Sequence, residues 1–321
     1  MWTGGGCDLF GRVVNCHGDL TSHGLSGRRG GASVALMSPG VSLFLLHALI
    51  DDYSSVPAAG GAGWAVRRTR PTAAGTALSP VVGRRVVEAE SCLNGADEEL
   101  LRDCAAPILI HGTAAAALTA WHTAAARRSA IGIDVAHERH RRCVESVHRT
   151  LALLTGLPRT VPVTVGLVLG PGWRDALDLV LARGRSVRFS VCGVDAPDAP
   201  ALVDAIRTAA AARCGFSWSC EHWQAVTDPS AGPLPGILNV LLATAAALRG
   251  ADQAAVGEEL ARTDTVDVVD AVSELDDALA REVRTLLSGF AVREAGRVSD
   301  ALIDLDLLPK ARQERWDALV G

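Results

Sequence analysis

Short runs of β-branched and other apolar residues alternate along most of this chain with longer stretches rich in alanine and leucine. Glycine, proline or aspartate bounds these runs, which is typical of strands buried on both faces of a parallel sheet. The pattern predicts strands at 81–87, 107–111, 130–135, 161–169, 186–191, 215–220 and 284–290. An eighth strand is expected if part of 41–50 is extended.

Helices are predicted between these strands, at 114–128, 137–155, 174–182, 199–213, 235–249 and 270–287. Alternation of strand and helix at this spacing indicates parallel βαβ units. We therefore predict an α/β fold, a (β/α)8 TIM-barrel-like single domain. An open, doubly wound sheet is the alternative. However, no predicted strand is followed by the GxGxxG turn and helix that bind NAD in that fold, so NAD is not expected as a cofactor.

The barrel domain is expected to span 37–310. Residues 1–36 are rich in glycine, poor in apolar residues and without a sustained period. Such a composition does not repay the entropy of ordering, so we predict a flexible N-terminal segment. Residues 311–321 would form a polar C-terminal tail.

Composition excludes several classes of partner. The net charge is −5 and no basic stripe with interleaved aromatic residues occurs, which argues against binding to nucleic acid. No apolar run reaches the roughly 18 residues of a membrane span. The eight cysteines are widely spaced without a CxxC pair, as expected of reduced thiols in a cytoplasmic protein. A small-molecule substrate is the expected partner, and nothing here fixes the oligomeric state.

Lysine occurs once, at Lys310, in a polar stretch close to the C-terminus. Schiff-base chemistry and pyridoxal-phosphate (PLP) chemistry both need a lysine amine in a desolvated pocket at the catalytic centre. Lys310 is a poor candidate for that role, so both reaction classes are disfavoured.

Titratable residues gather at the predicted strand ends, where barrel enzymes carry their active sites. Asp134 is close to the end of one strand, His111 ends another, and Glu221 and His222 follow a third. Asp134 and His222 are expected to serve as base and as acid or metal ligand, supported by His111 and Glu221. The alternatives are a helix N-cap for Asp134, a structural histidine at 111 and an exposed loop pair at 221–222.

Two further clusters are interpreted as structural. His137, His140 and His148 lie on one predicted helix, but their spacing is not that of HExxH and neighbouring arginines would repel a cation. This cluster is interpreted as a solvated helix face. Asp51 and Asp52 are interpreted as a helix end or loop, with Asp52 a lesser candidate for lining the barrel mouth.

The C-terminal third resembles an uncharacterised family of bacterial TIM-barrel-like proteins. The resemblance rests on three stretches, at 216–223, 235–242 and 288–294, followed by a closing Leu307-Leu308 pair. His222 and Asn239 match the family pattern, whereas Ser217 and Pro235 stand where relatives carry lysine and histidine. The resemblance implies a barrel fold and a family site that is altered or lost here.

These observations together predict a small-molecule enzyme, a lyase or isomerase that uses carboxylate and imidazole acid–base chemistry at the barrel mouth. It would work either without a cofactor or with a divalent metal. The alternative is a degenerate, non-catalytic barrel that binds a ligand or partner. That alternative predicts an apolar mouth lined by Trp218, Trp223 and Ser217.

Overall fold

The computed structural model describes residues 42–53, 81–95, 101, 107–125, 131–137, 143–191, 198–220, 223–232 and 234–308. All of them belong to one compact unit, Pro39–Gly321. The predictions for residues 1–36, for Lys310, for the tail at 311–321 and for Glu221 and His222 therefore lie outside the described residues.

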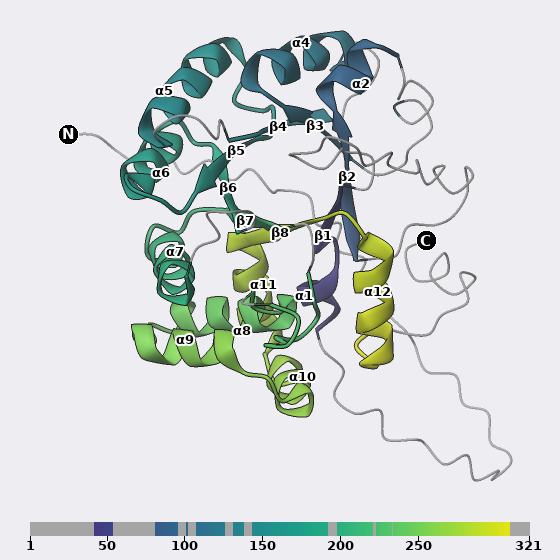
Figure 1. Cartoon of the computed structure of the whole chain (residues 1–321), viewed down its shortest axis with the longest axis vertical. Helices are drawn as coiled ribbons and strands as arrows, with labels where there is room; N and C mark the ends of the chain where they lie inside the picture. Colours follow the sequence, from purple (N-terminus) through teal and green to yellow (C-terminus); the bar gives the residue numbers. More distant parts are fainter. Residues whose placement is uncertain are drawn as a thin grey trace, which may run out of the picture. The chain divides into compact units, whose positions relative to one another are not determined.

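Eight parallel strands pair in chain order and close into a barrel (Figure 1). They are β1 (Ile50–Asp52), β2 (Val82–Glu88), β3 (Ile108–Gly112), β4 (Ile131–Val135), β5 (Val163–Val168), β6 (Ser186–Ser190), β7 (Phe216–Ser219) and β8 (Leu287–Val292). Pairing of β8 with β1 closes the ring. The predicted (β/α)8 barrel is confirmed, and the open sheet is excluded.

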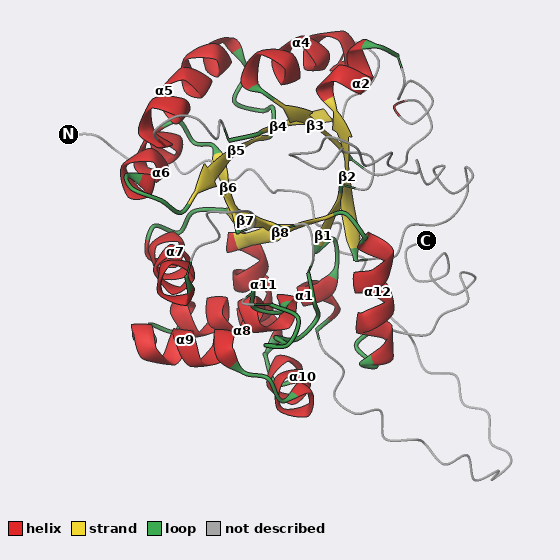
Figure 2. Cartoon of the chain, in the orientation of Figure 1, coloured by secondary structure: helices red, strands yellow, loops and turns green. Residues whose placement is uncertain are grey.

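Helices surround the ring of strands (Figure 2). Those that follow strands in the barrel alternation are α2 (Ala89–Leu93), α4 (Ala114–Ala125), α5 (Cys143–Leu153), α6 (Trp173–Ala182), α7 (Ala199–Ala211) and α12 (Ala295–Asp304). The connection from β7 to β8 carries α8 (Ile237–Leu248), α9 (Gln253–Ala261), α10 (Thr265–Ser273) and α11 (Asp277–Leu286). A short α1 (Leu43–Leu46) precedes β1, and the single-turn helix η1 (Leu154–Gly156) extends α5.

Two local predictions were wrong. Asp51 and Asp52 belong to β1 rather than to a helix end or loop, because this segment pairs with both β2 and β8. The single helix predicted at 270–287 is two helices. The side chain of Asp276 accepts a hydrogen bond from the backbone N–H of Leu279 (2.8 Å). Asp276 is therefore the N-cap of α11, which begins as a separate helix.

Alternation along the strands separates two environments. One face of each strand packs against the helices in the main apolar core, which includes Ile133, Phe189 and Trp218. The other face points into the barrel lumen. Among the described residues, the apolar cluster on that side contains only Tyr53, Val86, Leu109 and Ala291. Barrel interiors are usually filled with layers of branched aliphatic residues, so this lumen leaves room for polar groups.

The long β7–β8 connection is tied down by Asn239, which is fully buried at the start of α8. Its Oδ1 accepts from the backbone N–H of Thr227, and its Nδ2 donates to the carbonyls of Glu259 and Arg262, each at 2.9 Å. Gly236 precedes it, where an added Cβ would lie 2.4 Å from the carbonyl carbon of Val226. Asn239 therefore has a structural role.

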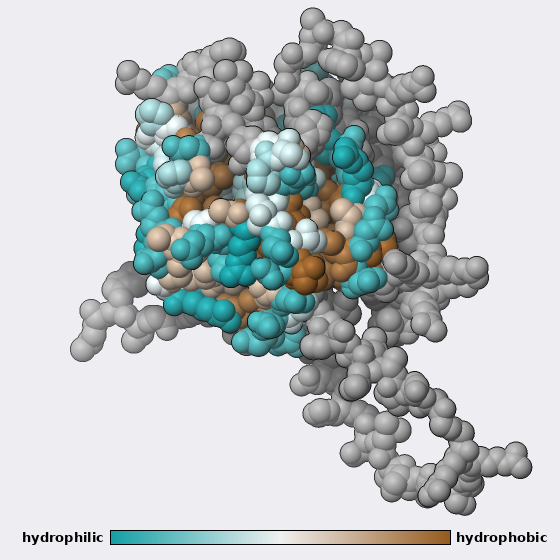
Figure 3. Space-filling model, turned by 60° about the horizontal axis from the view of Figure 1, so that its bottom comes forward, coloured by the Kyte–Doolittle hydropathy of each residue, from teal (hydrophilic) through white to brown (hydrophobic). Residues whose placement is uncertain are grey.

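The described part of one face of the molecule carries both hydrophilic and hydrophobic side chains (Figure 3). On the face drawn in Figure 3, hydrophilic side chains lie between smaller hydrophobic areas. Among the described residues, no helix combines the length and apolar character that crossing a membrane requires.

The cysteines differ in part from the expectation of reduced thiols. Cys143 and Cys214 are buried thiols, and burial raises the pKa of each above its ordinary value. Cys220, however, is disulfide-bonded.

Replacing Asn239 by alanine tests the hydrogen bonds that connect α8 to the end of α9. Asn239→Ala removes three hydrogen bonds of a fully buried side chain and leaves two carbonyls and one N–H without their partner, so the free energy of unfolding should fall by about 2–4 kcal/mol. Urea denaturation followed by circular dichroism measures this change. Asn94→Ala, at an exposed position after α2, is the matched control and should stay within about 0.5 kcal/mol of the wild type. Equal stability of the two variants would contradict the structural role.

Candidate functional site

The carboxylate of Asp134 is the centre of the polar groups in the lumen. It is fully buried on β4. Its Oδ2 contacts three donors from three other parts of the barrel: the Tyr53 hydroxyl, His111 Nδ1 at 2.6 Å and Arg188 Nη1. Because Oδ2 already accepts from the hydroxyl and the guanidinium, we assign Nδ1 of His111 as a third donor.

Strand register brings these groups together. His111 on β3 lies directly opposite Asp134 on β4, and both are the second-last residues of their strands. Tyr53 comes immediately after β1, and its ring packs edge-on against the His111 ring at 5.4 Å between centroids. The Arg188 guanidinium lies 5.1 Å from the centre of the Tyr53 ring. The cluster therefore lies at the carboxyl ends of the strands, which is the catalytic face of barrel enzymes.

A second ion pair shares the lumen. Arg84 on β2 donates from Nε and Nη2 to the two carboxylate oxygens of Asp51 on β1, at 2.7 and 2.6 Å. Asp51 also acts electrostatically on Asp134, on Arg188 and on Arg284. Arg284 belongs to the opposite end, where it donates to the carbonyls of Ala48 (3.0 Å), Ser288 (3.3 Å) and Leu287 at the beginnings of β1 and β8.

Burial and charge act against each other in this network. Burial raises the pKa of Asp134, and the charge and hydrogen bond of His111 partly oppose that rise. Burial lowers the pKa of His111, but the charge and hydrogen bond of Asp134, with a smaller contribution from Glu88, outweigh it and leave that pKa raised. Burial lowers the pKa of Arg188 to about 10, so its guanidinium remains charged at neutral pH.

The pair of His111 and Asp134 has the geometry of an oriented acid–base group. The His111 side chain is 23% exposed while that of Asp134 is 1% exposed. With Nδ1 held by the carboxylate, Nε2 is the nitrogen left to exchange a proton with a bound molecule. Asp134 is then a positioning residue, because three donors already occupy its Oδ2.

Two of the four candidate site residues are thus brought together, Asp134 and His111. The described hydrogen bonds of Asp134 all come from groups in the lumen. Glu221 and His222 lie outside the described residues, so their roles stay predictions. The side chain of Asp52 does not face the barrel lumen. Successive side chains of a strand point to opposite faces, so Asp52 lies on the face opposite to that of Asp51, and it pairs with Arg85 at 3.3 Å.

Sequence reasoning missed Tyr53, Arg188 and the pair of Asp51 with Arg84. A signal was available, because polar residues at every second position of an otherwise apolar strand mark the lumen side. Arg188 stands between Val187 and Phe189, which are fully buried in the outer core.

The tryptophans proposed for an apolar mouth lie elsewhere. Trp218 packs against Phe189 and Phe216 between sheet and helices, and Trp223 packs against Phe290. Ser217 faces the lumen side of β7 and is fully buried.

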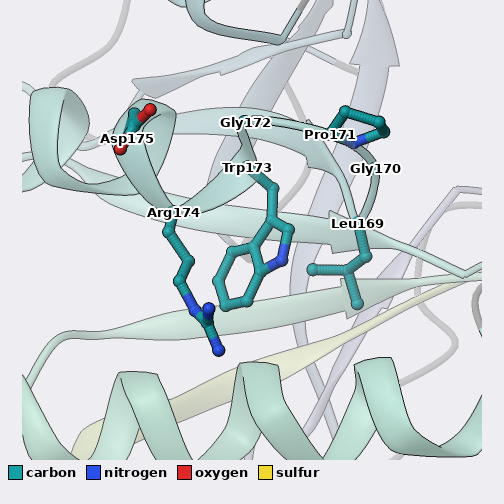
Figure 4. A pocket seen from close by; sticks show the side chains of 7 residues that line it. All are labelled: Leu169, Gly170, Pro171, Gly172, Trp173, Arg174 and Asp175. Carbon is teal, nitrogen blue, oxygen red and sulfur yellow. The ribbon is translucent and has the colours of Figure 1, made fainter.

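A separate surface pocket lies where β5 leads into α6 and is lined by Leu169–Asp175 (Figure 4). Trp173 and Asp175 lie on opposite sides of the helix start. Trp173 packs edge-on against Phe189, and Arg174 is paired with Asp204 at 2.5 Å. These groups are engaged in packing and surface pairing, so we place the candidate site at Asp134 and His111 instead.

Within the described ranges, no group of three or more His, Cys, Asp or Glu side chains is arranged to hold a metal ion. Of the helix histidines, His148 is exposed on α5, whereas His140 lies outside the described residues. Metal assistance through Glu221 and His222 therefore stays a prediction.

Comparison of the chain with protein-family models, with curated proteins and with solved structures found no match.

The pH dependence of stability tests the bond between His111 and Asp134. The folded-state pKa of His111 is raised above 6.5, so its stabilising contribution is complete below about pH 6.5 and is lost as the pH rises through the folded-state value. The free energy of unfolding of the wild type minus that of His111→Gln should therefore fall as the pH rises from about 6 to about 8. Urea titrations across this range measure the difference.

The exposed His148→Gln on α5 is the matched control for removing an imidazole. A difference between the wild type and His111→Gln that stays constant with pH would contradict the coupling.

Proposed function

We propose that this chain is a small-molecule enzyme of the lyase or isomerase class, in which His111 transfers a proton at the C-terminal mouth of the barrel. The observation that carries the proposal is the 2.6 Å contact between His111 Nδ1 and the fully buried Asp134. An imidazole whose one nitrogen is fixed by a buried carboxylate presents its other nitrogen in a defined direction and protonation state.

Each residue of the cluster has a distinct role in this proposal. Nε2 of His111 removes a proton from a substrate carbon or hydroxyl and returns it to the same or another atom. Asp134 holds the ring and stabilises the imidazolium that forms, while Arg188 and Tyr53 hold Asp134 in place. The charge and hydrogen bond of Asp134 outweigh the effect of burial and raise the pKa of His111, which stabilises the imidazolium that forms when Nε2 takes up a proton.

Convergence of titratable groups favours this proposal over a degenerate, non-catalytic barrel. That alternative needs an apolar mouth, whereas the described mouth contains Tyr53, His111 and Asp134 within mutual contact. Proton transfer to and from carbon is common to lyases and isomerases, so it offers a test that does not require knowledge of the complete reaction.

Hydrogen exchange at carbon tests the role of His111. The wild-type chain is incubated in D2O with a panel of small 2-hydroxy acids, keto acids and sugar phosphates, and loss of C–H signals is followed by proton NMR. Exchange with at least one compound is expected. His111→Asn should slow it by about 10²–10⁴-fold, and Asp134→Asn should slow it also by releasing the ring.

His122→Asn, exposed on α4, is the matched control and should retain the wild-type rate. Exchange that persists in His111→Asn would contradict the assigned role. A panel that shows no exchange at all would shift the balance to the ligand-binding barrel.

A further inference from the structure

The guanidinium of Arg188 uses only part of its hydrogen-bonding capacity. Its side chain is 5% exposed on β6, and Nη1 contacts Asp134. Nε and Nη2 are both buried, and neither has a hydrogen-bond acceptor among the described residues. Oδ1 of Asp134 is likewise buried without a donor there. Unmet donors on a buried charge are costly, so they indicate that something else accepts from them.

The two unmet donors form one edge of the guanidinium. In arginine, Nε–H and the N–H of Nη2 on the same side are parallel and match the spacing of two oxygens of a carboxylate or phosphate. The same lumen supplies an example, because Arg84 uses Nε and Nη2 to hold both oxygens of Asp51. Arg188 presents the corresponding edge without such a carboxylate.

The strands on either side of Arg188 do not supply one. Its neighbours in register are Gly166 on β5 and Ser217 on β7. Gly166 has no side chain, and the Ser217 hydroxyl is directed to the Val187 carbonyl at 3.5 Å. Asp51 is already bound by Arg84. The edge is therefore left to a group from outside the described fold.

We infer that Nε and Nη2 of Arg188 bind an oxyanion group, a carboxylate or a phosphate, carried by the molecule on which His111 acts. That the anion belongs to the substrate rests on the proposed function, whereas binding of the anion does not. Arg188 and His111 contact the same oxygen of Asp134, so an anion bound to Arg188 would lie in the same part of the lumen as the imidazole. An anion at this edge would also supply the acceptors that Nε and Nη2 lack among the described residues.

Thermal unfolding with inorganic phosphate and with malonate, at an ionic strength held constant with chloride, tests the inference. For the wild type, at least one of the two anions should raise Tm by about 2 °C or more. Phosphate alone would indicate a phosphate-bearing substrate, and malonate alone a carboxylate. Arg188→Lys keeps a positive charge near Asp134 but loses the parallel pair of donors, so its affinity should fall about tenfold or more.

Arg174→Lys, at an exposed position on α6, is the matched control and should respond as the wild type does. The readout is Tm, without turnover, which separates failure of anion binding from failure of the proposed proton transfer. No response in the wild type, or equal responses in the wild type and Arg188→Lys, would overturn the inference.

A crystal structure of the wild-type chain grown with the same anions gives a test that does not depend on the folding of Arg188→Lys. An oxyanion within hydrogen-bond distance of both Nε and Nη2 is expected. Ordered water alone at that edge, under conditions that saturate any binding, would overturn the inference.

Discussion

The buried carboxylate of Asp134 is the interaction on which the lumen depends. A carboxylate withdrawn from water is tolerated only when charges and hydrogen bonds replace its hydration. Here the replacements come from Tyr53 after β1, His111 on β3 and Arg188 on β6. Since no one of these segments supplies them all, the network forms only when the strands are in their closed register.

The two ends of the barrel use arginine differently. At the amino ends of the strands, Arg284 donates to the backbone carbonyls of Ala48, Leu287 and Ser288 and so ties α11 to the first and last strands. Nearer the carboxyl ends, Arg188 contacts a side chain that holds the candidate acid–base group. This division matches the general separation of stability from chemistry in barrels of this kind.

The sequence predicted the barrel because seven of its strands are short apolar runs whose periodicity does not depend on their neighbours. It placed β1 poorly, since Asp51 and Asp52 resemble a turn until the pairing with β2 and β8 is known. Asp134 and His111 were identifiable from their positions at strand ends. Alternation along β6 marks Arg188 as facing the lumen, but the contacts of Arg188 and Tyr53 with Asp134 were not predictable, because only closure of the barrel brings β1 and β6 to β4.

Nitrogen-15 NMR of the histidine side chains would test the central claim, that Asp134 fixes the proton of His111 on Nδ1. The His111 signals are identified by their loss in His111→Gln. The account predicts a neutral imidazole protonated at Nδ1, and an imidazolium that persists above the ordinary pKa of 6.5. A neutral ring protonated at Nε2, or a pKa at or below 6.5, would contradict it.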